Sequence, residues 1–268
     1  MTVTIKLTSK RSQLQRYREL LYVLVERNLK TRYRGSFLGV YWSLLNPLIM
    51  TGLYTAIFGT AFAAYFDNSI IDYVLAAFTG LAAIHFFSGS TSQALVSIVD
   101  NGALLNKMKL PISIFPISII GANVFQFSVG MLPILIVITL LKSKSIVNLI
   151  ALFCPLIALC MVCMGIGFLV SSLYIFFRDL PFFYELVTFV AWMSSPVFYP
   201  PEIVPESVKN ILILNPLLPI IESIRQIALS KDLPDLSLMA HSSIGGLIIL
   251  SIGWSCFSLW RSQFMDLL

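Results

Sequence analysis

Three long stretches of this sequence carry no charged residue, and they limit what the chain can fold into. They are residues 35–66, 110–141 and 145–177, which are 32, 32 and 33 residues long. An α-helix needs only about 20 apolar residues to cross the hydrocarbon core of a membrane. The composition agrees, because 57% of the residues are hydrophobic and 12% are charged, whereas about 25% are charged in a typical soluble domain. The sequence therefore predicts an integral membrane protein.

Charged residues and Pro or Gly breaks divide the chain into six predicted transmembrane helices. These spans are continuously apolar and do not alternate in ten-residue units, which favours helices over the strands of a barrel. We expect an all-α fold with one membrane domain over residues 1–268, because no linker or low-complexity tract marks a boundary. The predicted spans are 37–65, 73–98, 112–141, 146–176, 180–200 and 241–261.

The distribution of Lys and Arg predicts the orientation of these spans. An even number of spans places both termini on one side, which then carries 13 of the 18 Lys and Arg residues, nine of them before residue 35. Cytoplasmic loops carry the excess of Lys and Arg, so both termini are expected in the cytoplasm. Residues 1–34 lack the apolar core of a signal peptide. The net charge of +5 then indicates topology and contact with membrane lipids rather than nucleic-acid binding.

Residues 10–34 are predicted to form an amphipathic interface helix. Over residues 14–30 the apolar side chains share one arc and the charged ones gather opposite. Such a helix is too polar to span, and suits either an interfacial helix that also meets a cytoplasmic partner or a basic topology signal. We expect Arg32 to reach lipid headgroups, and Gly35 and Gly39 to allow a turn and close packing before the first span. The candidate coupling residues here are Arg27, Lys30, Arg32 and Arg34.

The segment between the second and third spans, residues 100–111, is predicted to form a short cytoplasmic coupling helix. Asp100 or Asn101 can cap this helix, and Pro111 ends it. A helix that presents apolar side chains beside a basic edge suits a groove on a soluble protein; the alternative is an ordinary polar loop. The candidate contact residues are Asn101, Leu104, Leu105, Lys107, Met108 and Lys109.

Residues 201–230 follow the fifth span and remain rich in Ile and Leu. The apolar run 210–221 is too short to cross and is interrupted by Pro216 and Pro219. Broken apolar segments at membrane depth are tolerated where they pack on protein or line a cavity. We expect two short re-entrant helices that act as an outer gate, or alternatively an amphipathic cap on the bundle.

Ionisable residues inside the spans are few. Glu185 and His85 do not form the chain of acids that a proton relay requires. Aromatic residues are abundant, and their rings either anchor span ends at the membrane interface or provide platforms for the apolar faces of sugars. The candidate channel or substrate residues are Tyr41, Trp42, Phe86, Phe87, Phe183, Tyr184, Trp192 and Tyr199.

The sequence argues against a membrane-embedded enzyme such as a prenyl or glycosyl transferase. That chemistry usually requires acidic clusters that hold a metal-diphosphate. Asp67 and Asp72 are five residues apart, and Asp232 and Asp235 form only a loop. The four cysteines lie in apolar runs and are expected to be small buried hydrophobes rather than metal ligands. No catalytic, cofactor-binding or metal-binding residue is predicted.

Five segments, in order and at similar spacing, resemble the permease subunit of the ABC-2 transporter family. The resemblance covers nearly the whole chain and is to the branch that exports O-antigen, capsular polysaccharide or teichoic acid. The segments are RYRGSFLGVYWSLLNPL (32–48), NGALLNKMKLP (101–111), FFRDLPFF (176–183), SPVFYPPEIVP (195–205) and NPLLPIIESIRQIAL (215–229).

This resemblance implies a homodimer in the bacterial cytoplasmic membrane, bound to two copies of a separate nucleotide-binding subunit. This chain has no GxxxxGK[ST] phosphate loop, so ATP and Mg are expected on the partner subunit. The resemblance implies that a lipid-linked glycan, for example in lipopolysaccharide biosynthesis, passes through a channel lined by spans 1 and 5 of both protomers. The alternative is a permease of the same family that exports a drug or small lipid.

Overall fold

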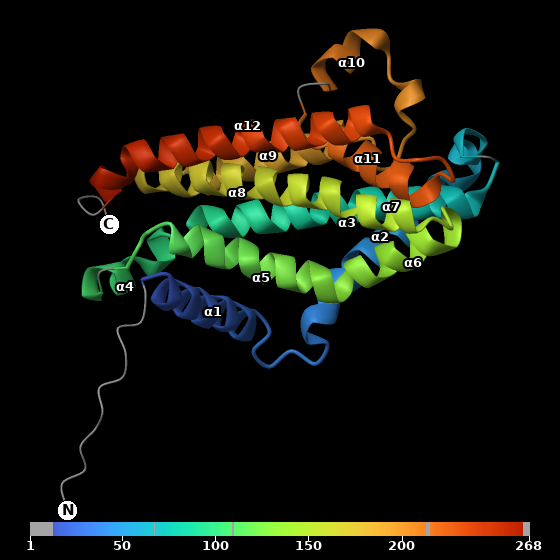
Figure 1. Cartoon of the computed structure of the whole chain (residues 1–268). Coiled ribbons are helices and arrows are strands. Elements are labelled where there is room, and N and C mark those ends of the chain that lie inside the picture. Colours follow the sequence, from blue (N-terminus) through green and yellow to red (C-terminus); the bar gives the residue numbers. More distant parts are fainter. Residues whose placement is uncertain (1–12, 67, 109, 213–214, 265–268) are drawn as a thin grey trace, which may run out of the picture.

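The computed structural model describes residues 13–66, 68–108, 110–212 and 215–264, and over these ranges every regular element is a helix (Figure 1). Short 3-10 turns at Gly39–Tyr41, Ala63–Tyr65, Val99–Asn101, Pro201–Ile203 and Arg261–Gln263 join or extend the α-helices. The α-helices are α1 (Gln13–Arg32), α2 (Trp42–Phe62), α3 (Ile70–Val96), α4 (Gly102–Lys107), α5 (Ile114–Gly130), α6 (Leu132–Lys142), α7 (Ile146–Ala151), α8 (Phe153–Phe176), α9 (Leu180–Ser194), α10 (Glu206–Leu212), α11 (Leu218–Leu229) and α12 (Leu236–Trp260).

Four stretches of helix within the described residues are long and apolar enough to cross a membrane. They are Gly39–Tyr65, Ile70–Val96, Ile146–Phe176 and Leu236–Gln263. The bent pair α5 and α6 makes a fifth if it is counted as one span, and α9 is apolar but shorter. The all-helical membrane fold expected from the sequence is therefore confirmed, with four or five spans by length and composition.

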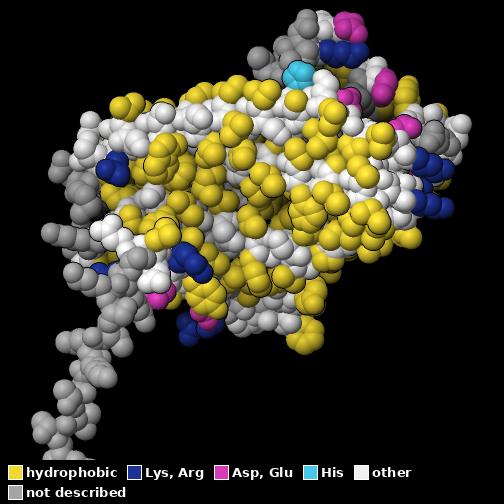
Figure 2. Space-filling model, in the orientation of Figure 1, with side chains coloured by type: hydrophobic (Ala, Val, Ile, Leu, Met, Phe, Trp, Pro, Cys, Tyr) yellow, Lys and Arg dark blue, Asp and Glu magenta, His cyan; other side chains and the backbone are white. Residues whose placement is uncertain are grey.

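Helix α3 lies at the centre of the bundle and packs against α2, α5, α8, α9 and α11. Its most apolar stretch is 67% buried, against 17% for the corresponding stretches of α2 and α12. Figure 2 shows apolar side chains over the middle of one face, with most charged side chains toward the ends of the bundle. This distribution is typical of a helical bundle surrounded by lipid.

Different residues pack at the two ends of the bundle. At one end, called here the α4 end, Leu24, Leu105, Ile175 and Phe264 pack in one apolar cluster. This cluster joins α1, α4, the last turn of α8 and the residues after α12. At the opposite end, called the α11 end, Asp72 at the start of α3 forms an ion pair with Lys142 at the end of α6.

The sequence predicts one continuous helix over 112–141, but the structure divides this stretch into α5 and α6. The chain bends by 46° between α5 and α6. Pro133 lies in the first turn of α6, where it has no N–H to donate and its ring crowds the carbonyl of Val129. Gly130 ends α5 just before the bend. This span is therefore a broken helix rather than a rod.

Two of the other predicted span boundaries differ most clearly from the helix ends of the structure. The fifth span was predicted over 180–200, but α9 ends at Ser194 because Pro196 disfavours helical backbone at Ser195, which is extended. The sixth was predicted from residue 241, but α12 begins at Leu236. The carboxylate of Asp235 accepts hydrogen bonds from the backbone N–H groups of Ser237 and Leu238 and so caps the helix five residues earlier.

Helices α8 and α12 approach closely at glycine residues. A Cβ at Gly253 would lie 1.9 Å from the backbone oxygen of Gly165, and a Cβ at Gly165 would lie 2.4 Å from the backbone oxygen of Ile249. In lipid there is no hydrophobic driving force for helices to associate, so their association depends on close packing. Small residues allow the two backbones to approach closely and to gain dispersion contacts. This contact fixes α12 against the bundle.

Gly253→Ala is expected to lower the free energy of unfolding by at least about 2 kcal/mol, because backbone on α8 would have to move. Thermal unfolding in detergent micelles measures the change. Gly245→Ala on the same helix is the matched control, since no atom lies within 4 Å of its added Cβ. Equal melting temperatures for the two variants would contradict the close approach.

Candidate functional site

Helix α1 packs along α5. Of its apolar arc, Leu24 is buried, and Tyr17, Leu20 and Leu21 lie against the apolar cluster of the α4 end. Burial raises the pKa of the Tyr17 phenol, and a hydrogen bond with Ser113 lowers it. The amphipathic pattern of the sequence therefore reflects contact with protein. Residues 10–12 of the predicted interface helix lie outside the described residues.

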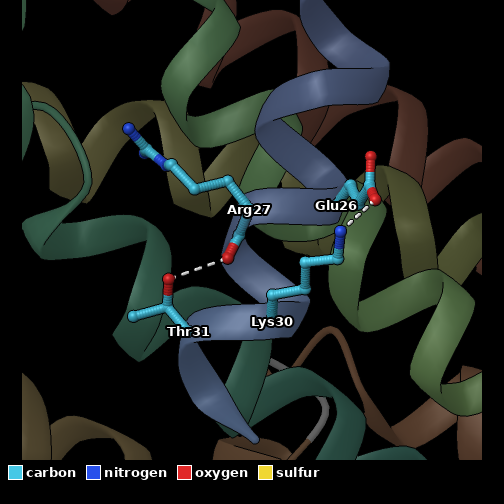
Figure 3. A network of polar contacts seen from close by, with 4 residues as sticks. All are labelled: Glu26, Arg27, Lys30 and Thr31. Atoms are coloured by element: carbon cyan, nitrogen blue, oxygen red, sulfur yellow. Dashed lines mark hydrogen bonds and ion pairs between the residues drawn. The ribbon is translucent and has the colours of Figure 1, made fainter. Parts of the chain in front are cut away.

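The charged residues of α1 point in different directions (Figure 3). Lys30 pairs with Glu26 at 2.5 Å on an exposed side of the helix, and this pair raises the pKa of Lys30. The hydroxyl of Thr31 donates to the carbonyl of Arg27. The Arg27 side chain points away from the ion pair, and its Nη2 donates to Oδ1 of Asn101 at 2.8 Å. Arg27 therefore links α1 to the segment before α4.

The structure corrects the prediction for residues 100–111. The α-helix is only Gly102–Lys107, and it ends before Pro111. Asn101 is at the N-cap position but its side chain makes no capping bond. Instead its Nδ2 donates to the carbonyl of Ser97, and its Oδ1 accepts from Arg27. Asn101 is a link between helices rather than a cap.

The apolar side chains of α4 are not all presented for docking. Leu105 is 3% exposed and belongs to the apolar cluster of the α4 end, and Leu104 packs against that cluster. The sequence predicts that Leu105 is presented to a partner, but the structure buries its side chain in packing within this chain. Met108 is 52% exposed, and Lys107 is exposed as well. Lys109 lies outside the described residues.

Arg32 enters a group of amides, and the prediction that it reaches lipid headgroups is wrong. Its Nη1 donates to Oδ1 of Asn123 at 3.1 Å and to Oε1 of Gln126 at 2.5 Å. Its Nη2 donates to Oε1 of Gln93. Nδ2 of Asn123 also donates to Oε1 of Gln93 at 3.1 Å. We call Arg32, Gln93, Asn123 and Gln126 the amide cluster; it joins the end of α1 to α3 and α5.

The turn that follows Arg32 is only partly as predicted. Gly35 and Gly39 have positive φ values of 76° and 51°, which L side chains rarely adopt, so the predicted turn is confirmed. No atom lies within 4 Å of a Cβ built at either position, so the predicted close packing is wrong. Arg34 is exposed.

A cavity of about 150 Å³, called here the inner cavity, lies beside the amide cluster between α2, α3 and α5. Three aromatic residues, Trp42, Phe86 and Phe127, form part of its wall. Its polar lining residues are Ser43, Asn46, His85, Gln93, Asn123 and Gln126.

A second cavity, of about 310 Å³, lies between α2, α3 and α9 and is called here the α9 cavity. It shares Asn46 and His85 with the inner cavity, so the two adjoin. Glu185, Thr188 and Trp192 line its α9 side. Polar and ionisable residues within membrane-spanning helices generally face a cavity and mark a functional pathway.

The aromatic candidates differ in exposure. Phe87 and Tyr184 are buried, and neither lines the cavities described above. Phe86 is largely buried and lines the inner cavity. Tyr199 is partly buried and donates from its hydroxyl to the carbonyl of Met193 at 3.2 Å. The remaining candidates lie on exposed surface or at a cavity wall and are Tyr41, Trp42, Phe183 and Trp192.

Residues 201–230 contain the two short helices that the sequence predicts. Helix α11 is anchored in the bundle, since Ile220, Ile221, Ile224 and Ile227 are fully buried. Helix α10 projects from the bundle (Figure 1). The outer gate role that the sequence suggests for this segment stays a prediction.

Arg225 on α11 is a site residue that sequence reasoning missed. Its Nη2 donates to the carbonyl of Pro196 at 2.8 Å, just beyond α9, and its guanidinium lies 5.9 Å from the ring centre of Phe66. Burial lowers the pKa of Arg225 to about 10, against the attraction of Glu222 and Glu202. Arg225 therefore fixes the end of α9 to α11.

Sequence reasoning also missed Gln93, Asn123 and Gln126, because it considered only ionisable residues inside the spans. Isolated amides within apolar runs were the available signal, since each costs free energy at membrane depth unless it is hydrogen-bonded. What the sequence did not contain was their pairing with Arg32, which lies 61 to 94 residues away. Among the described residues, no cluster of His, Cys, Asp or Glu is placed to hold a metal ion.

Comparison with known proteins assigns the family. A family model described as ABC-2 type transporter matches residues 19–229, from α1 through α11. The chain belongs to the ABC-2 type transporter family. The resemblance seen in the five sequence segments is thereby confirmed, and the chain falls in a family of transporter membrane subunits.

Relatives of this ABC-2 transporter match it over almost their full length. It is 28% identical over 252 residues to the O-antigen export system permease protein RfbA of Klebsiella pneumoniae, covering 93% of this chain and 95% of that protein. It is also 28% identical over 256 residues to a protein of the same name from Myxococcus xanthus, covering 94% of this chain and 95% of that protein.

Arg32→Met is expected to lower the free energy of unfolding by about 2 to 3 kcal/mol, because it leaves three amide oxygens without their charged donor. Thermal unfolding in detergent measures this loss. Arg34→Met is the matched control, since Arg34 is exposed two residues away, and it should change stability by less than about 0.5 kcal/mol. Similar losses in both variants would show that general charge, rather than the amide cluster, matters here.

Arg225→Met is expected to cost about 2 kcal/mol, because the carbonyl of Pro196 loses its donor. The pKa of Glu222 is raised by burial, and the positive charge of Arg225 partly offsets this increase. A raised folded-state pKa means that acidification through it adds stability, so the variant should gain more stability than the parent as the pH falls. Melting temperatures across a pH series test both effects. The exposed Lys231→Met is the control; equal pH responses in all three proteins would contradict the assignment.

Proposed function

We propose that this chain is the permease subunit of an ABC exporter that moves a lipid-linked polysaccharide across the bacterial cytoplasmic membrane. The observation that carries the proposal is the near full-length similarity to relatives named O-antigen export system permease proteins. Adjoining polar cavities with aromatic walls support it, because amides, hydroxyls and ring faces are the groups that bind sugars.

The proposed complex is a homodimer with two copies of a separate ATP-binding subunit, which also holds the Mg. Helices α2 and α9 of both protomers form the proposed channel wall. They suit this role because α2 is the least buried long helix together with α12, and α9 exposes Phe182, Leu186 and Val190. A wall that is apolar in one protomer needs a second copy or lipid to cover it.

The proposal also counts α9 as a span, the fifth of six along the chain, with both termini in the cytoplasm. Fifteen residues of helix extend about 22 Å, which is short of a hydrocarbon core of about 30 Å. The re-entrant α11 segment completes this outer part of the wall, and Arg225 holds its junction with α9. Movement within residues 201–230 is the proposed opening of the outer gate.

Force from the ATPase is proposed to enter at the α4 end. The surface offered there includes Met108, Lys107 and Lys30, which are exposed. Arg27 and Asn101 transmit it between α4 and α1 through their hydrogen bond. The amide cluster then carries the displacement from α1 to α3 and α5.

Met108→Asp is expected to reduce glycan export at least tenfold, because a desolvated carboxylate opposes apolar docking. The measurement is ATP hydrolysis and glycan translocation by the complex in proteoliposomes, where hydrolysis without export indicates uncoupling. Leu233→Asp, at an exposed apolar residue near the α11 end, is the control and should export normally. Unchanged export by Met108→Asp would overturn the docking assignment.

Deletion of the protein tests the function itself. The expected result is lipid-linked glycan that accumulates on the cytoplasmic side, detected by its protection from periplasmic or external glycosidases. If glycans reach the surface normally while a drug or small lipid is retained in the cells, the chain belongs to the alternative class of exporter.

A further inference from the structure

The inner cavity is a partly open space with many polar lining residues, and its walls come from three helices. Trp42 and Asn46 lie on α2, His85 and Gln93 on α3, and Gln126 on α5. Its volume of about 150 Å³ is several times the roughly 10 to 15 Å³ that one water molecule needs by the same measure. It is therefore large enough for a small polar ligand.

The amide cluster determines which atoms of the two glutamines that line this cavity remain free to donate. Arg32 donates to the oxygens of Gln93 and Gln126, so these oxygens are occupied. Among the described residues, the Nε2 groups of both glutamines have no hydrogen-bond partner. Each amide nitrogen has two hydrogens to donate. Because the guanidinium binds their oxygens, Gln93 and Gln126 keep their Nε2 groups free to donate, and both residues line the cavity.

Two further polar side chains of the lining come from α2 and α3. Asn46 is exposed and His85 is half-buried; both line the cavity, and neither side chain makes a hydrogen bond to any described residue. Their donors and acceptors are therefore accessible and available to a ligand that enters the cavity.

Aromatic rings complete the lining. Phe86 and Phe127 meet edge to face, with ring centres 5.1 Å apart, and Trp42 forms another part of the wall. A ligand that satisfies this cavity has both apolar C–H faces and several hydroxyl groups. No carboxylate lines the cavity, and the charge of Arg32 is directed to amide oxygens. The chemistry therefore favours a neutral polyhydroxylated ring over an anion.

We propose that the inner cavity is a binding subsite for one neutral pyranose unit. Gln93 and Gln126 donate to its hydroxyl oxygens, Asn46 and His85 exchange hydrogen bonds with its other hydroxyls, and Trp42 faces its C–H groups. This inference rests on the proposed export of a glycan and deepens it. Because the cavity adjoins the α9 cavity through Asn46 and His85, the subsite lies beside the proposed channel wall.

The test uses the full chain in lipid nanodiscs and free monosaccharides. Saturation-transfer difference NMR is recorded with mannose, galactose and N-acetylglucosamine, each alone, and with glucose 1-phosphate as an anionic probe. At least one neutral sugar is expected to give a signal, and Asn46→Leu or His85→Leu should reduce it at least fivefold. Neither substitution breaks a hydrogen bond within the described chain, so both variants should fold.

Ser251→Leu, on an exposed face of α12, is the matched control and should bind the sugar normally. The proposal is overturned if no neutral sugar binds, if only the sugar phosphate binds, or if the two cavity variants bind as well as the control. Glycan export by the same variants is measured separately. Normal glycan export with no sugar signal would contradict the subsite and leave the proposed function standing. A parent protein that binds sugar but exports no glycan would contradict the proposed function and leave the subsite standing.

Discussion

The position of Arg32 is the interaction on which the rest of the arrangement depends. A guanidinium at the end of an amphipathic helix would ordinarily remain at the membrane surface. Here it donates to three amides on α3 and α5, so a helix too polar to span is held against the bundle. The same hydrogen bonds set the orientation of the glutamines at the inner cavity. Anchoring of α1 and polarity of the cavity therefore have one physical cause.

The remaining helices divide into a fixed part and a part held by few contacts. Helices α8 and α12 meet backbone to backbone at Gly165 and Gly253, and α3 is buried among its neighbours. Helix α9 instead packs mainly on α3 and α8 and ends where Arg225 binds the following carbonyls. Sparse contacts are typical of elements that move, so α9 is expected to move more readily than α3, α8 or α12.

The sequence was sufficient for the helical membrane fold, because uncharged runs longer than 30 residues leave few alternatives in lipid. It located most helices but not the bend at Pro133 or the early start of α12 at Asp235, where one side chain decides the backbone locally. It was weakest for the site. The burial of Leu105 and the partners of Arg32 and Arg225 depend on contacts between distant segments, and no local pattern of residues specifies those contacts.

The packing of Phe264 has a practical consequence for work on this transporter. Phe264 is fully buried, and it shares its apolar cluster with Leu105 of α4 and Leu24 of α1. Any label or affinity tag fused shortly after this residue begins next to α1 and α4, the elements proposed above to contact a partner ATPase. The exposed loop around Leu233, between α11 and α12, is at the other end of the bundle and offers an insertion point that leaves this region undisturbed.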